Sequence, residues 1–251
     1  MDIVDNLNTT INLNDLNASE ERIVIGNNAK VNLIGEIKED RKIEITVGEN
    51  SELKSYIIQK NGSLEQKNIA KAYARIYSNT IYLGNGNTKI INALEGDGSE
   101  AYDIEIFAIN GEKKLKIDTT LLHIGKNTSG NILVKGTAKD TAIAKVDGMI
   151  KIEKHASGAN SFLDEHVMLL NPGARADTNP QLEIENNDVS SRHAASVSQI
   201  DENKIFYMMA RGLKREQARN LIVEGFLGSA IDRIDNKEIK EKVSELISES
   251  F

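Results

Sequence analysis

The sequence predicts a mainly β fold, in which short strands favour a solenoid, followed by a helical C-terminal subdomain. The strand-like runs recur roughly every 8–14 residues, a spacing that also suits a sandwich or a barrel. Three observations favour the solenoid: asparagine is abundant and can stack in turns, aromatic residues make up only 4% of the chain, and the later runs follow one another without hairpin turns. No exact repeat is visible, so periodicity alone leaves these alternatives open.

Residues 1–21 are rich in Asn and Asp, and we expect them to form a loose arm or a partial first coil. The predicted β core follows over residues 22–200. Apolar and polar residues alternate over residues 42–47, which is typical of a strand with one buried face. Asn-Gly pairs that begin at residues 61, 85 and 110 mark turns between runs. Before residue 201 the sequence offers one helical pattern, a short one around residues 66–74.

The periodicity becomes helical at Asp201, and residues 201–251 form the predicted helical subdomain. Asp201 is a suitable N-cap for a helix over residues 202–211, and Gly212 is a suitable stop. Two further helices are expected over residues 215–233 and 237–249. The apolar residues at helical spacing in the second helix are Ala218, Leu221, Ile222, Phe226, Ile231 and Ile234. A solenoid needs a cap at its open end, and these helices can supply it.

Composition argues against several classes of function. The formal net charge of −7 disfavours nonspecific binding of nucleic acid, which needs a basic surface. The chain has no cysteine, so it holds neither a disulfide nor a thiolate ligand for a metal or cluster. No run reaches about 18 apolar residues, and the N-terminus lacks the pattern of a signal peptide. We therefore expect a cytoplasmic protein that binds neither nucleic acid nor a membrane.

The sequence carries no motif of an enzyme active site. It lacks the P-loop, the GxSxG nucleophile elbow and the HExxH metal motif. The four histidines are His123, His155, His166 and His193, and no two of them are separated by four residues. We therefore expect that the protein is not an enzyme.

Residues 180–213 combine a strand-like run, an Arg-His pair and a helix stop in a specific order. They include Pro180, Leu182-Glu183-Ile184, Asp188, His193-Ala194-Ala195-Ser196, Ile205-Phe206-Tyr207 and Arg211-Gly212-Leu213. In this order they resemble the C-terminal core of the SufB/SufD family, the scaffold subunits of the SUF iron–sulfur cluster assembly machinery. The resemblance is ungapped over residues 165–212 and looser from 121 to 234. It implies that the core is a right-handed parallel β-helix.

The same resemblance implies a site near His193, because a histidine in this motif lies near the SufB–SufD interface implicated in cluster assembly. Glu165 stands where SufB has a reactive cysteine, and Ala194 where SufB has a functional glutamate. In these respects the chain is more similar to SufD or to a short archaeal-type homologue. Glu165, His166 and His193 offer oxygen and nitrogen ligands that Fe(II) accepts, and we treat them as a hypothetical iron site. Alternatively, His193 orients the junction by hydrogen bonds, and residues 165–166 form a solvated turn before a strand over residues 167–170.

The resemblance also implies partners. The chain would be a non-catalytic scaffold that dimerises through residues 167–197, as a homodimer or as a SufB/SufD-type heterodimer, and that docks a SufC-like ABC ATPase through its C-terminal helices. The residues expected to bind the ATPase are Phe206, Tyr207, Arg211, Arg215, Arg219, Glu224 and Phe226. We expect no tightly bound cofactor, and at most iron or a transient iron–sulfur cluster at a subunit interface. Two other interpretations stay open: a purely structural β-helix dimer, and a carbohydrate-active solenoid, against which the low aromatic content argues.

Overall fold

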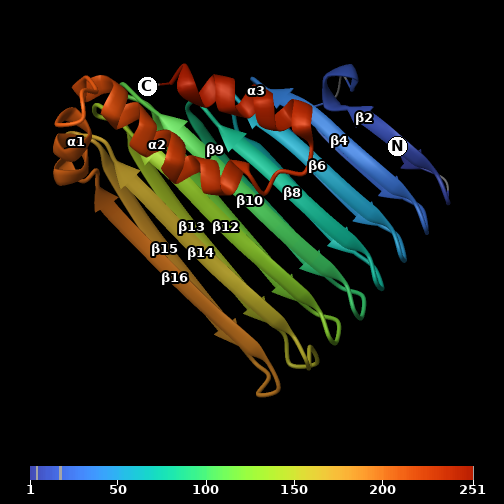
Figure 1. Cartoon of the computed structure of the whole chain (residues 1–251). Helices are drawn as coiled ribbons and strands as arrows, with labels where there is room; N and C mark the ends of the chain where they lie inside the picture. Colours follow the sequence, from blue (N-terminus) through green and yellow to red (C-terminus); the bar gives the residue numbers. More distant parts are fainter. Residues whose placement is uncertain (4, 17–18, 251) are drawn as a thin grey trace.

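The computed structural model describes residues 1–3, 5–16 and 19–250, and within them the chain winds into a parallel β-helix (Figure 1). Strands β1, β3 and so on to β15 form one eight-stranded sheet, which we call the odd sheet. Strands β2, β4 and so on to β16 form a second eight-stranded sheet, the even sheet. Three helices follow the last strand. The predicted fold class, a mainly β solenoid with a helical C-terminal part, is confirmed.

The odd sheet consists of β1 (Asp2–Ile3), β3 (Glu20–Ile25), β5 (Arg41–Val47), β7 (Leu64–Ala70), β9 (Gly86–Leu94), β11 (Lys114–His123), β13 (Ile143–Ile152) and β15 (Arg175–Ile184). The even sheet consists of β2 (Asn8–Asn12), β4 (Lys30–Ile37), β6 (Glu52–Gln59), β8 (Arg75–Tyr82), β10 (Glu100–Ile109), β12 (Ser129–Ala138), β14 (Asn160–Leu169) and β16 (Ser190–Gln199). A short 3-10 turn, η1 (Leu13–Asp15), follows β2. The described part of residues 1–21 thus pairs with the following coils, while residues 17–18 of that segment and Phe251 of the helical subdomain lie outside the described residues.

The coils lengthen along the chain. Near the start, Lys42 pairs with Glu20 of the preceding coil. Further on, Ile143 pairs with Lys114, and Arg175 pairs with Ile143, so the separation between partners grows toward the last coil. The strands lengthen as well, from 6 residues in β3 to 10 in β10. Because the repeat length drifts, the sequence shows no fixed period, and the expected strand length was too short for the later coils.

One corner of the coils carries a column of left-handed turn residues. Asn28, Asn50, Tyr73 and Asn127 have φ angles of 54°, 55°, 56° and 55°. Each donates its backbone N–H to a carbonyl in the turn of the next coil, at 2.9 Å for Asn28, 3.0 Å for Asn50 and Tyr73, and 2.8 Å for Asn127. Asparagine tolerates this conformation better than most non-glycine residues, so stacked turns account for part of the abundance of asparagine.

The helix expected around residues 66–74 is wrong, because residues 64–70 form strand β7. Gln66 and Asn68 point into the solenoid and are 1% and 0% exposed. Polar residues at inward positions remove the contrast between the two faces, so the alternation that identifies a strand is lost from the sequence. Elsewhere the interior is filled mainly by Ile, Leu, Val and Ala.

The C-terminal helices are α1 (Glu202–Met209), α2 (Arg215–Ile231) and α3 (Lys237–Ser248). The Asp201 side chain accepts from the backbone N–H of Asn203 at 2.9 Å, which confirms the predicted N-cap. Helix α2 buries Ala218, Val223 and Leu227, whereas Leu221, expected on its apolar face, is 50% exposed. No helix within the described residues is long and apolar enough to cross a membrane.

Helices α2 and α3 cross the outer face of the even sheet near the C-terminal ends of its strands (Figure 1). They cover an apolar outer surface that includes Ile58, Ile81, Ile106 and Leu133. The expectation that the helices cap the open end of the solenoid is therefore wrong for α2 and α3. The outward side chains of β6, β8, β10 and β12 form this apolar surface. Burying it against α2 and α3 stabilises the three C-terminal helices, which we call the tail, on the side of the solenoid.

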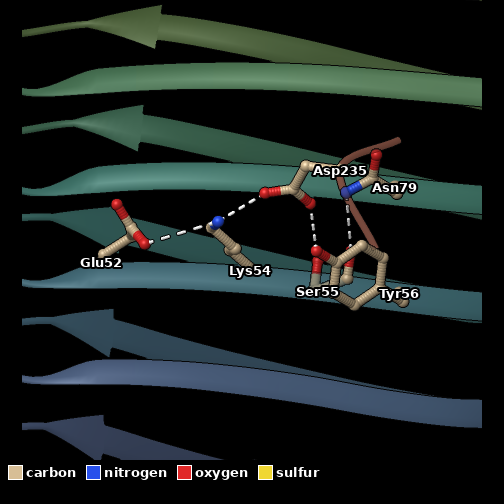
Figure 2. Close-up of polar contacts among 6 residues, drawn as sticks. All are labelled: Glu52, Lys54, Ser55, Tyr56, Asn79 and Asp235. Carbon is tan, nitrogen blue, oxygen red and sulfur yellow. Dashed lines mark hydrogen bonds and ion pairs between the residues drawn. The ribbon is translucent and has the colours of Figure 1, made fainter. Parts of the chain in front are cut away.

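Asp235, in the loop between α2 and α3, attaches this loop to β6 (Figure 2). Its carboxylate accepts hydrogen bonds from Tyr56 Oη and from Lys54 Nζ. Lys54 Nζ also lies 3.7 Å from Glu52 Oε1. We call Asp235, Tyr56 and Lys54 the latch. It holds the tail at one defined place on the solenoid.

Candidate functional site

The end of the solenoid after the last coil is bounded by β15 and β16. Each is the outermost strand of its sheet, and no further strand among the described residues pairs with it. Inward-facing apolar side chains reach solvent here: Ile184 on β15 is 42% exposed and Val197 on β16 is 40% exposed. Unpaired strand edges with apolar side chains are suited to pairing with another chain. We call this surface the open end.

Glu165 lies on β14, one strand inside the open end, and points into the solenoid. Its residue is 0% exposed, and neither carboxyl oxygen finds a hydrogen-bond partner among the described residues. Burial raises the pKa of Glu165 to about 8, and the negative charges of Glu105 and Asp147 add to the rise. The side chain has room because it lies against Gly148, where any Cβ would overlap its carboxyl group.

His193 lies within strand β16 and not at a junction between strands and helices. It pairs in parallel register with Leu163, which points into the solenoid, so His193 faces the same way. Because no strand covers β16, His193 is exposed at the open end. Its neighbour Arg192 points to the opposite face and stacks on Phe162, with its guanidinium carbon 4.7 Å from the ring centroid.

His166 points to the outer face of β14, opposite to Glu165. Its Nδ1 lies 2.6 Å from Ser196 Oγ, and its Nε2 lies 2.7 Å from Asp164 Oδ1. The structure therefore brings Glu165 and His193 to one inner surface and places His166 on the other side of the strand. No group of three or more His, Asp or Glu side chains within the described ranges is arranged to hold a metal ion.

The tail exposes apolar side chains on α1, in the loop after it and on α2. Phe206 and Tyr207 are 72% and 58% exposed, and Met209, Leu213 and Leu221 are also exposed. We call these five residues the tail patch. The Arg211 guanidinium carbon lies 4.6 Å from the Tyr207 ring centroid, which adds a cation at the edge of the patch. Exposed aromatic side chains beside an arginine are typical of protein-binding surfaces.

The other residues expected to bind an ATPase have different surroundings. Arg215 makes two hydrogen bonds to Glu202, at 2.7 and 2.6 Å, and joins the starts of α1 and α2. Glu224 lines a groove of 320 Å³ between α2 and α3. Arg219 donates to the backbone oxygen of Leu170, so it attaches the tail to the solenoid.

Phe226 also contacts the solenoid. Lys135 Nζ lies 4.7 Å from its ring centroid and donates to its backbone oxygen at 3.2 Å. Of the seven residues, Phe206, Tyr207, Arg211, Arg215 and Glu224 remain on the outer surface of the tail.

Sequence reasoning missed a set of polar residues inside the solenoid. Asp103 and Glu105, on β10, are 2% and 0% exposed. Residues 103–106 alternate between acidic and apolar side chains, and such alternation usually indicates that the acids face solvent. The pattern misleads here because α2 covers the outer face of β10, so both faces of the strand are buried.

Comparisons with known proteins agree with this architecture. A family model described as "SUF system FeS cluster assembly, SufBD core domain" matches residues 9–226. The chain is 35% identical over 154 residues to the iron–sulfur cluster assembly protein SufD of Bacillus subtilis, which covers 61% of this chain and 35% of that protein. It is 31% identical over 141 residues to a SufBD family protein of Synechocystis, and 29% identical over 134 residues to SufB of Bacillus subtilis. The match spans about a third of the length of each of these curated relatives.

Proposed function

The chain belongs to the SufBD core domain family of the SUF system, and from this premise we propose that it is a non-catalytic scaffold subunit for the assembly of iron–sulfur clusters. The observation that carries the proposal is the family match, which runs through the β-helix and continues to residue 226 in α2. The architecture supports it, because a rigid solenoid presents an open strand end and a separate helical surface. We expect a cytoplasmic protein of this kind to work as part of an assembly.

We assign subunit pairing to the open end. Strands β15 and β16 offer unpaired backbone groups, and Ile184 and Val197 offer apolar side chains. The partner is a second copy of this chain or a SufB/SufD-type paralogue. The carboxyl group of Glu165 and the imidazole of His193 would then lie near the subunit boundary, where the partner can add ligands. Because burial raises the pKa of Glu165, this group would lose its proton on binding iron. Fe(II) accepts both ligand types, so iron or a transient cluster is the cargo assigned to this boundary. His166, on the outer face, is assigned a supporting place beside Asp164.

Pairing can be tested by analytical ultracentrifugation of Val197→Glu. A charge placed on the inward surface of the open end should weaken the dimer by more than tenfold in dissociation constant, because it would be buried without a partner. Ile143→Glu is the matched control, since Ile143 is 39% exposed on β13, away from this surface. A dimer that survives Val197→Glu, or that fails equally with Ile143→Glu, argues that pairing lies elsewhere.

The tail patch is the proposed docking surface for a SufC-like ABC ATPase, with Arg211, Arg215 and Glu224 as its polar rim. Two anchors are aromatic and more than half exposed, which is the composition of interface hot spots. Arg219 and Phe226 contribute indirectly, because they hold α2 on the solenoid. The latch fixes the other end of the helical pair.

Docking can be tested by capture of the cognate ATPase on the full chain. We expect Phe206→Ser to weaken capture by about tenfold or more, as truncation of an interface anchor does. The control is Tyr73→Ser, because Tyr73 is 62% exposed but lies on a turn of the solenoid. If a soluble ATPase is captured by the native chain and by Phe206→Ser with the same affinity, docking through this patch would be contradicted.

The carbohydrate-active alternative gains no support from the outer face of the even sheet. Sugar-binding sites need aromatic faces that are open to solvent. Tyr77 and Tyr102, on the outer face of the even sheet, instead stack on each other, with ring centroids 5.5 Å apart and planes 16° apart.

A further inference from the structure

A line of polar side chains runs through the interior of the solenoid from β7 to β10. Gln66 Nε2 donates to Asn68 Oδ1 at 3.0 Å, and Asn68 Nδ2 donates to Asn92 Oδ1 at 2.8 Å. Asn92 Nδ2 in turn donates to Asp103 Oδ2 at 2.9 Å. Each amide donates an N–H to the next acceptor, so the hydrogen bonds all run in one direction and end on the carboxyl group of Asp103. We call this line, together with the polar side chains around its end, the interior seam.

Asp103 and Glu105 lie two residues apart on the same inner face of β10. Tyr82 Oη donates to Glu105 Oε2. The other oxygen of each acid, Asp103 Oδ1 and Glu105 Oε1, has no partner among the described residues. Burial raises the pKa of Asp103 well above its usual range and the pKa of Glu105 to about 7.

The charged groups that act on the two acids all disfavour ionisation. Glu105 acts on Asp103, and Asp118 acts on Glu105, so each carboxyl faces negative charge. The phenol of Tyr82 is uncharged, because burial raises its pKa as well. No lysine, arginine or histidine is among the groups that shift either acid. An ionised pair would therefore be buried without a counter-ion, which is strongly unfavourable.

Hydroxyl groups surround the free carboxyl oxygens. Ser78 and Thr80 on β8 pair in register with Asp103 and Glu105, and Thr119 on β11 faces Glu105 from the other sheet. Ser78 and Thr119 lower the pKa values of the acids beside them, yet their hydroxyls fall short of full hydrogen-bond geometry. All three hydroxyls are 0% exposed, and none of them makes a fully formed hydrogen bond among the described residues, although Thr80 lies close enough to Tyr82 to lower its pKa.

So many unpartnered buried groups cannot all stay unsatisfied. Each one costs free energy of the order of a lost hydrogen bond, and together they would consume a large part of the net stability of an ordinary domain. Buried polar groups that the chain does not satisfy are usually satisfied by ordered water, which makes two to four hydrogen bonds at once.

We propose that the interior seam binds ordered water, which bridges the free oxygens of Asp103 and Glu105 to the surrounding hydroxyls and leaves both acids uncharged in the folded protein below neutral pH. The ligand class is water and its exchangeable protons. The site lies inside the solenoid, on the inner face of the strand β10 whose outer face α2 covers, and it is neither the open end nor the tail patch. The charge of Glu105 also acts on Glu165, one strand inside the open end. It does not depend on the proposed function, and it would stand if that function failed.

The test is infrared spectroscopy of the full chain at about pH 6, where exposed carboxyl groups are ionised and Glu105, with a pKa of about 7, is mostly protonated. A protonated carboxyl has a C=O stretch that is separate from the carboxylate bands, and we expect this band in the folded protein. Glu105→Gln should remove roughly a third of it, since Glu165, whose burial raises its pKa to about 8, contributes as a third buried acid. Glu65→Gln is the matched control, because Glu65 is an exposed glutamate on the outer face of β7, and it should leave the band unchanged.

Transfer into D₂O distinguishes a hydrated seam from a dry one. If water reaches the acids, the band shifts long before the amide protons of β8 and β10 exchange. If Glu105→Gln does not fold, Thr119→Val serves instead, since it keeps the shape, removes one hydroxyl and should shift the frequency of the band. A band that Glu105→Gln leaves unchanged, or exchange only together with the core amides, would overturn the proposal.

Discussion

Removing Asp235 should loosen the tail by an amount that the latch geometry allows us to estimate. Tyr56 is 2% exposed, and its hydroxyl donates to the Asp235 carboxylate, an interaction with a charged group worth about 1.5–3 kcal/mol. The Asp235 side chain is 48% exposed, which reduces that figure to about 1–2 kcal/mol, and the Lys54 ion pair adds less than about 1 kcal/mol. We therefore expect Asp235→Ala to lower the free energy of unfolding by about 2 kcal/mol.

The assay is a double-mutant cycle in urea, followed by circular dichroism. Tyr56→Phe alone should cost about 1 kcal/mol, and the double variant should cost less than the sum, with a coupling energy of about 1 kcal/mol. Asp232→Ala is the control from the same loop. The Asp232 side chain is 80% exposed, and its change should cost less than about 0.5 kcal/mol. Additive losses within about 0.5 kcal/mol would refute the latch.

The pH dependence gives an independent check of the same reasoning. Burial alone would raise the pKa of Asp235, but the hydrogen bonds from Lys54 and Tyr56 outweigh it and lower the pKa below its usual value. A carboxyl with a lowered folded-state pKa stabilises the fold above its unfolded pKa and loses that contribution as the pH falls through the folded value. The difference between the native chain and Asp235→Ala should therefore shrink in acid below the usual pKa of aspartate.

Three further outcomes are expected. Tyr73→Asn should raise the free energy of unfolding by about 0.5–1 kcal/mol in chemical denaturation, because asparagine suits a φ of 56° better than tyrosine. Gly225→Ala should also stabilise the fold by about 0.5–1 kcal/mol, because a Cβ at this position of α2 would meet open space. Gly136→Ala should instead destabilise it by about 1–3 kcal/mol, because its Cβ would overlap the Phe107 ring. Equal effects of the two variants in thermal melts would contradict this packing. Because its pKa is raised in the folded protein, protonated Glu105 contributes stability that is complete below about pH 4.5 and lost by about pH 7. Glu105→Gln should therefore reduce the fall of the unfolding free energy across that pH window by about 3 kcal/mol. An unchanged pH profile would argue against a raised pKa at Glu105.

Several features of the candidate site were within reach of sequence reasoning. The order of residues from Pro180 to Leu213 identified the family, and the N-cap at Asp201 located the change from strands to helices. The position of His193 within a strand was not predicted, because Arg192 and the serines around it read as a polar connection. Such a reading assumes that a strand has one largely apolar face, and the inner face of β16 mixes Val197 and Ala195 with His193 and serine because it lies at an end of its sheet.

Local chemistry was enough to predict many of the strands, the asparagine turns, the approximate helix boundaries and the family, because each depends on residues that are neighbours in the chain. It missed β7, which was expected to be helical, and β16. Which face of a strand points inward, how far the coils lengthen between the first and the last, and where the tail lies were decided by contacts between distant residues. The seam around Asp103 and Glu105 shows the reason most clearly. Once helices cover the outside of a sheet, both faces of its strands are buried, and alternation along the chain no longer distinguishes core from solvent.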